Sequence, residues 1–167
     1  KDTRIKVIKL SRNFGSFVAC LAGIRNSTGD CLTVISADLQ DPPEMICDMA
    51  REWEAGSKVV LAVRKKRKDP LFVKLTSALF YFMMKRFVMS DMPLGGFDFF
   101  LIDKQVAGIL SRVQEKNTSL SGLILWLGFD RKIIYYNREK RDLGKSMWTF
   151  RKRFKYFIDS ITAFSYW

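Results

Sequence analysis

The sequence contains no histidine and only three cysteines. Without histidine, nucleophilic catalysis by Ser-His or Cys-His pairs and metal sites with imidazole ligands are excluded. Cys20, Cys31 and Cys47 lie in apolar stretches without Cys-x-x-Cys spacing, which predicts free core thiols in a reducing compartment and no structural zinc site. Any chemistry therefore has to use carboxylates, cationic side chains and a metal.

Long hydrophobic runs are also missing, since no stretch reaches the roughly 18 apolar residues of a membrane-spanning helix. The first residue is Lys1 rather than Met, and the chain opens on a strand pattern without a signal peptide. We therefore expect both ends to have been cut from something longer.

Positive charge is in excess, with 29 Lys and Arg against 17 Asp and Glu and a net charge of +12. This excess implies an anionic partner, which could be nucleic acid, an acidic membrane surface or a phosphorylated substrate. The sequence has no recognition helix, RNA-binding strand motif or zinc-finger spacing, so we expect no nucleic-acid partner.

Alternating strand and helix patterns predict one α/β domain with a mainly parallel sheet flanked by helices. Strand patterns cover residues 6–10, 31–37, 58–63, 97–102 and 132–136, and helical patterns cover residues 14–22, 42–55, 70–89, 103–113 and 120–127. Crossovers of about 20 residues between the first strands favour parallel pairing. The run 31–37 is apolar and β-branched, which is typical of a buried parallel strand.

The segment from Asp38 to Glu44 follows this strand and opens a helix. Asp41 can serve as the N-cap, with Pro42 as the first helical residue and Glu44 closing a capping box. Asp38 and Gln40 have no such structural explanation. An acid and an amide at a strand end suit Mg²⁺ or Mn²⁺ held together with a nucleotide diphosphate. The alternative is that Asp38 only hydrogen-bonds the following turn.

Two basic segments follow later in the chain. The run 64–68 stands at the end of a strand, where it is either a solvated loop or a phosphate-binding segment. Basic residues return at 138–146, followed by aromatic and basic residues interleaved at helical spacing in 147–157. The latter pattern suits an interfacial helix in an anionic leaflet, or an ordinary amphipathic helix on its own core.

Taken together, these segments resemble the family 2 glycosyltransferases with a GT-A fold, in particular the polyprenyl-phosphate glycosyltransferases that are similar to dolichol-phosphate mannose synthase. The matching pieces run in family order over nearly all of the chain: Leu10–Gly15, Ala22-Gly23, Thr28–Asp30, Ile35–Glu44, Gly95–Asp98, and Arg138 with Gly144–Ser146 and Trp148. Each piece is weak alone, and together they are specific.

The resemblance implies an N-terminally truncated GT-A catalytic domain over residues 1–145 and an amphipathic juxtamembrane helix over residues 146–167. The family's Pro-Val-Tyr-Asn-Glu and Asp-Asp-Gly-Ser motifs, which bind the base and ribose of the donor, are absent. We therefore expect residues 1–167 alone to show little or no transfer.

The resemblance also assigns the site. Asp38 would be a metal ligand and a catalytic residue, with Gln40 as the second metal ligand; Ser36 stands where the family commonly has aspartate. Asp98 would be catalytic and face the donor sugar, or it would only pair with an arginine. The donor would contact Arg12, Ser36 and Asp38, and the acceptor phosphate would contact Arg64, Arg67, Arg138, Arg141 and Lys145.

The implied reaction moves a hexose from a nucleotide-diphosphate donor to a polyprenyl phosphate with inversion, for cell-envelope or glycan synthesis. The partners would be the nucleotide sugar, the polyprenyl phosphate lipid and the membrane surface, with the enzyme at the cytoplasmic face of the membrane. The alternatives are a soluble glycan-directed family 2 glycosyltransferase and a non-catalytic relative in which Ser36 marks a degraded metal site.

Overall fold

The computed structural model describes residues 2–38, 40–65, 82, 85–86, 92–93, 96–114, 118–137, 158–159, 162 and 164. These ranges contain both helices and strands, and the predicted α/β class is confirmed. The predicted helix 70–89, the basic segment 138–146 and the aromatic and basic segment 147–157 lie largely or wholly outside the described residues.

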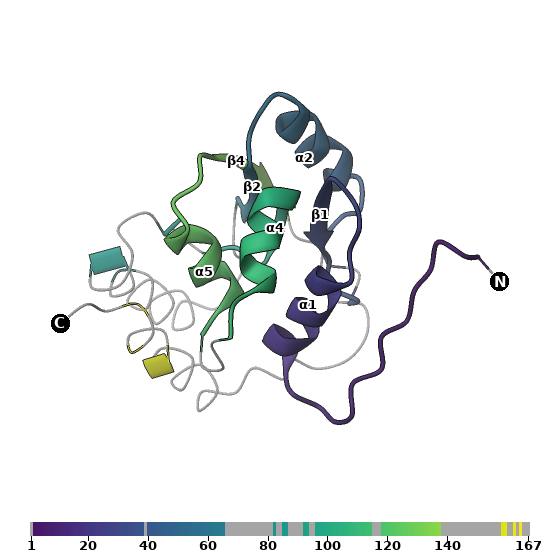
Figure 1. Cartoon of the computed structure of the whole chain (residues 1–167). Helices are drawn as coiled ribbons and strands as arrows, with labels where there is room; N and C mark the ends of the chain where they lie inside the picture. Colours follow the sequence, from purple (N-terminus) through teal and green to yellow (C-terminus); the bar gives the residue numbers. More distant parts are fainter. Residues whose placement is uncertain are drawn as a thin grey trace.

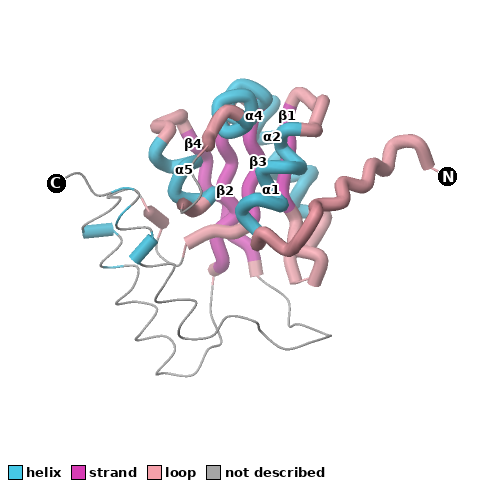
Figure 2. The backbone as a smooth tube through the Cα atoms, turned by 60° about the horizontal axis from the view of Figure 1, so that its bottom comes forward, coloured by secondary structure: helices cyan, strands magenta, loops and turns pink. Residues whose placement is uncertain are grey.

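The sheet has four described strands: β1 (Cys31–Val34), β2 (Val59–Arg64), β3 (Phe99–Asp103) and β4 (Arg131–Tyr136), in the order β1-β3-β2-β4. Figure 2 shows them side by side, with helices around them. β3 runs antiparallel to both β1 and β2, whereas β4 runs parallel to β2. Three strands therefore share one direction, and the reversed strand β3 lies between β1 and β2.

The prediction of a buried parallel strand over residues 31–37 is wrong in its length, its burial and its pairing. The strand β1 ends at Val34, and its four residues are only half-buried. It is an edge strand of the described sheet, paired antiparallel with β3. The apolar run is real, but β3 takes the position that a direct parallel pairing with β2 would need.

Helices cover both faces of the sheet (Figure 1). On one face α1 (Ser16–Arg25), α4 (Lys104–Ser111) and α5 (Leu120–Trp126) share a core with Val59, Leu61, Val63, Phe100 and Ile102. On the other face α2 (Met45–Glu54) packs through Met49 on Val60, Ala62, Phe99 and Leu101. Successive residues of β2 and β3 thus point to opposite cores, which explains their continuous apolar sequence.

Helix starts agree with the sequence prediction at Asp103 but not at Asp41. Asp103 caps α4, because its side chain accepts from the Gln105 N–H at 2.9 Å. The helix α2 begins at Met45 after Glu44, without a side-chain cap hydrogen bond. The predicted capping box is therefore wrong, since Asp41 is buried and accepts from the Tyr136 hydroxyl instead.

The predicted strand over residues 6–10 is also wrong. Residues 5–10 have no regular structure, and Ile5 and Val7 are 71% and 88% exposed. The segment extends away from the helices and the sheet (purple in Figure 1). A strand needs a neighbouring strand for its backbone hydrogen bonds, and no described strand pairs with this segment.

The predicted cysteine chemistry is confirmed in part. Cys20, Cys31 and Cys47 are free thiols, but Cys47 is exposed on α2 rather than in the core. Burial raises the pKa of the Cys20 thiol, which keeps it protonated and a weak nucleophile near neutral pH.

We predict that Phe99→Ala destabilises the chain by about 3–5 kcal/mol. The Phe99 side chain is fully buried beneath α2, and its truncation leaves a cavity in the middle of the sheet. Urea unfolding monitored by circular dichroism measures the loss. Trp126→Ala, at an exposed position on α5, is the matched control and should change stability by well under half of that amount. Equal losses for the two variants would contradict the assigned core.

Candidate active site

The sheet topology brings four separate polar segments to one edge. Because β1, β2 and β4 share a direction, the turn after β1, Arg64 at the end of β2 and Tyr136 at the end of β4 lie at the same edge. Asp98 stands just before β3, and because β3 is reversed its start lies there too. Ligands of open α/β sheets bind at this carboxyl edge.

The turn after β1 holds the predicted metal ligands. Ser36, Asp38 and Gln40 are half-buried, and Asp38 Oδ1 accepts from the Gln40 N–H at 3.4 Å. This long contact is the turn hydrogen bond that the sequence left open as the alternative role of Asp38. It engages one carboxylate oxygen and leaves the Gln40 side-chain amide out of that contact.

The donor set of this turn fits a hard divalent cation that is shared with a substrate. Asp38 offers carboxylate oxygens and Gln40 an amide oxygen, and Mg²⁺ typically takes one or two protein ligands of this kind together with substrate phosphates. Within the described part of the chain, no three His, Cys, Asp or Glu residues gather closely enough to hold a metal by themselves. The turn therefore suits a cation bound jointly with a diphosphate.

Asp98 pairs with an arginine, which is one of the two roles predicted for it. The Arg64 Nη2 atom lies 2.9 Å from Asp98 Oδ2, with Arg64 19% and Asp98 74% exposed. Burial lowers the pKa of Arg64, but Asp98, Tyr136 and Asp41 together outweigh this effect and raise it. Arg64 therefore stays positively charged at this edge of the sheet, where it pairs with the exposed carboxylate of Asp98.

Two residues of the site were missed by the sequence analysis. The Tyr136 hydroxyl donates to Asp41 Oδ1 at 2.6 Å, between side chains that are 5% and 1% exposed. The Arg64 guanidinium lies close enough to the same hydroxyl to oppose the rise in the Tyr136 pKa. The sequence feature that could have indicated Tyr136 is a tyrosine, with a polar hydroxyl, at the end of an apolar strand. No feature near Asp41 in the sequence indicates its contact with Tyr136.

The remaining predicted site residues are not brought to this edge by the described structure. Arg12 lies in the exposed segment before α1, with its guanidinium carbon 4.7 Å from the centroid of the Phe14 ring. The predicted phosphate-binding residues Arg67, Arg138, Arg141 and Lys145 lie outside the described residues. Their roles stay predictions.

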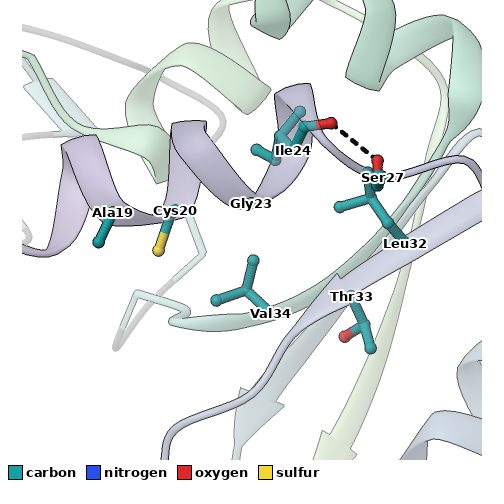
Figure 3. Close-up of a pocket in the computed structure, with 8 residues that line it drawn as sticks. All are labelled: Ala19, Cys20, Gly23, Ile24, Ser27, Leu32, Thr33 and Val34. Carbon is teal, nitrogen blue, oxygen red and sulfur yellow. Dashed lines mark hydrogen bonds between the residues drawn. The ribbon is translucent and has the colours of Figure 1, made fainter. Parts of the chain in front are cut away.

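A hollow of about 410 Å³ lies elsewhere, between α1 and β1 (Figure 3). It is lined by Ala19, Cys20, Gly23, Ile24, Ser27, Leu32, Thr33 and Val34. The Ser27 hydroxyl that faces it already donates to the Ile24 carbonyl at 2.8 Å. None of the predicted site residues lines this hollow, so the chemistry is assigned to the sheet edge.

The opposite edge of the sheet carries a structural carboxylate. Asp103 Oδ2 accepts from Trp53 Nε1 at 2.9 Å and from Lys58 Nζ at 3.2 Å. Burial raises the pKa of Asp103, but the hydrogen bonds from Gln105, Trp53 and Lys58 outweigh burial and lower it. This carboxylate ties α2 and α4 to the sheet, away from the candidate site.

We predict that Tyr136 ionises about two pH units later than an ordinary tyrosine. Burial, then the hydrogen bond with Asp41 and its charge, raise the pKa from 10.0 to about 12, although Arg64 acts in the opposite direction. Because its pKa is higher in the folded state, the protonated Tyr136 stabilises the fold. This contribution to the free energy of unfolding is fully present below pH 10 and is lost as the pH rises towards 12. Absorbance of the phenolate after rapid pH jumps measures this step, which Tyr136→Phe should remove. Titration of every tyrosine near pH 10 would contradict the assignment.

Comparisons with known proteins show which family this chain is similar to. The family model for glycosyl transferase family 2 matches residues 1–108. An uncharacterised glycosyltransferase of Bacillus subtilis, YkcC, is 41% identical over 99% of this chain and 51% of its own length. An uncharacterised glycosyltransferase of Synechocystis, sll0501, is 34% identical over 98% of this chain and 52% of its own length.

A third relative, the bactoprenol glucosyl transferase of Shigella phage SfX, is 30% identical over 98% of this chain and 54% of its own length. The chain spans about half the length of the curated relatives that it matches. The resemblance seen in the sequence motifs is confirmed by the family match. The chain therefore belongs to glycosyl transferase family 2, a family of transferases.

Proposed function

We propose that the protein transfers a hexose from a nucleotide-diphosphate sugar to a polyprenyl phosphate, with inversion, at the cytoplasmic face of a membrane. The observation that carries this proposal is the shared sheet edge, where the oxygen donors of Asp38 and Gln40 and the cationic Arg64 come together. Both substrates of such a reaction are phosphorylated, which suits this combination. The names of the bactoprenol glucosyl transferases support the lipid acceptor.

The turn after β1 is the proposed donor side. Asp38 and Gln40 would hold Mg²⁺ or Mn²⁺ together with the diphosphate, and the bound cation would supply Lewis-acid stabilisation of the leaving nucleotide. Ser36 lies in the same turn and would contribute a hydroxyl. The sheet edge then orients the anomeric carbon of the sugar towards the acceptor.

Arg64 is the proposed acceptor side. A phosphate monoester has its second pKa near 6, so the acceptor is largely a dianion at neutral pH and attacks without a strong general base. This agrees with a chain that lacks histidine. A guanidinium carries five N–H donors, so Arg64 can donate to a phosphate oxygen while it stays bonded to Asp98.

Attachment to the membrane rests on charge. The chain has a net charge of +12, and residues 147–157 interleave aromatic and basic side chains as interfacial segments do. None of the described helices is both long enough and apolar enough to cross a bilayer.

The main prediction is that Asp38→Ala lowers transfer on the order of 100-fold, which is the cost of losing a charged group that stabilises the leaving diphosphate. The assay uses the full-length parent in membranes and follows label from a panel of nucleotide sugars into a lipid-extractable product with Mn²⁺ or Mg²⁺. Asp48→Ala is the control, because Asp48 is an exposed carboxylate on α2 that pairs with Arg51. Equal activities of the two variants would refute the role of Asp38.

The same assay separates the rival functions. Label in a water-soluble glycan instead of lipid would favour a soluble glycan-directed enzyme. Absence of transfer from every donor would favour a non-catalytic relative, and Ser36→Asp would then be the variant with which to restore a metal site.

A second prediction concerns Arg64. Arg64→Ala should raise the KM for polyprenyl phosphate about tenfold or more, because it removes a charge-assisted hydrogen bond to the acceptor, while the KM for the nucleotide sugar changes less. Arg51→Ala, which removes an exposed arginine on α2, is the control and should leave both constants unchanged. A rise confined to the donor KM would move Arg64 to the donor side.

A further inference from the structure

The hydrogen bond between Tyr136 and Asp41 has no part in the reaction proposed above, yet it joins two ends of the site. Asp41 directly follows Gln40 in the turn after β1, whereas Tyr136 ends β4, 95 residues later in the chain. Arg64 is the register partner of Tyr136 on β2, and its charge acts on the Tyr136 hydroxyl. A single hydroxyl therefore lies between the proposed donor side and the proposed acceptor side.

The ring of Tyr136 is itself held firmly. It packs in the core beneath α2, with its centroid 6.0 Å from that of Phe99 and the two rings nearly perpendicular. A buried side chain in such packing has few alternative rotamers, so the position of its hydroxyl is set by the sheet rather than by solvent.

The turn after β1 needs such a support. Residues 35–38 lie outside regular structure, and the contact between Asp38 and Gln40 is local and long, at 3.4 Å. Asp41 is 1% exposed, and a buried carboxylate needs hydrogen-bond donors. Its 2.6 Å bond from Tyr136 has the short length of a charge-assisted bond. Fixing Asp41 also limits where Gln40 and Asp38 can lie, because consecutive Cα atoms are about 3.8 Å apart.

We propose that Tyr136 is a positioning residue of the site: its hydroxyl, bonded to Asp41 and placed beside Arg64 by the strand register, holds the cation-binding turn and the phosphate-binding guanidinium at a fixed separation. This inference rests on the proposed function for the identity of the two ligands. It assigns Tyr136 no contact with substrate. The residue acts through Asp41 on the donor side and through Arg64 on the acceptor side.

The test compares Tyr136→Phe with Tyr135→Phe in the full-length parent. The first variant keeps the packed ring and loses only the hydroxyl, and the second makes the same change at the neighbouring position, which is 59% exposed. Tyr136→Phe should raise the half-saturating Mn²⁺ concentration and the KM for the acceptor by about tenfold each. Mn²⁺ binding is measured in the presence of a nucleoside diphosphate, by electron paramagnetic resonance of the free Mn²⁺. The kcat should change less than threefold, and Tyr135→Phe should match the wild type.

Hydrogen exchange supplies a readout that needs no substrate. In the metal-free protein, the peptide over residues 35–46 should exchange about tenfold faster in Tyr136→Phe than in the wild type or in Tyr135→Phe. Unchanged exchange together with unchanged Mn²⁺ binding overturns the positioning role, even if wild-type transfer to lipid is observed. Conversely, absence of lipid transfer in the wild type defeats the proposed acceptor but leaves the exchange and Mn²⁺ measurements decisive for Tyr136.

A purely structural role gives a different pattern, in which Tyr136→Phe lowers the unfolding temperature while Mn²⁺ binding and the acceptor KM stay at wild-type values. That pattern overturns the proposal.

If Tyr136→Phe does not fold, the proposal is tested on the wild-type protein instead. Mn²⁺ with a nucleoside diphosphate should then protect the peptide over residues 35–46 and the peptide that contains Tyr136 together, and protection confined to the turn overturns the proposal.

Discussion

A carboxylate that is shut away from water has to be hydrogen-bonded, and this requirement at Asp41 constrains the elements around the site. The bond from Tyr136 ties the turn after β1 to the end of β4, and Arg64, the register partner of Tyr136, adds the end of β2. The ion pair with Asp98 extends the connection to the start of β3. All four strands are thus linked at one edge by polar side chains, in addition to their backbone pairing.

The reversed direction of β3 makes this arrangement possible. In an all-parallel sheet, the start of a central strand would lie at the edge opposite the ends of its neighbours. Because β3 is antiparallel to β1 and β2, Asp98 reaches Arg64 across a single strand spacing. The site therefore combines residues from strand ends with Asp98 from a strand start, and Asp98 forms an ion pair with Arg64.

The sequence predicted what local patterns control. The helical patterns near residues 14–22 and 42–55, the cap at Asp103 and the α/β class all depend on residues near one another in the chain, and the structure has α1, α2 and the cap close to these places. Contacts between residues far apart in the chain, such as strand pairs, were not predictable in the same way. The run 6–10 has the composition of a strand but no paired strand in the described structure, and Asp41 looked like a cap because its true partner is 95 residues away. Of the candidate site, the segments were predicted and the connection between Asp41, Tyr136 and Arg64 was not.

The central position of β3 also determines when the sheet can form. The strands β1 and β2 are complete by residue 64, but each pairs with β3, which ends only at residue 103. During synthesis the earlier strands have to wait for the later one, with the apolar faces of β2 uncovered meanwhile. Long-range pairing of this kind slows folding and leaves unpaired edges open to association. The order of strands along the chain therefore leaves β1 and β2 without the strand that separates them in the sheet until β3 has been synthesised.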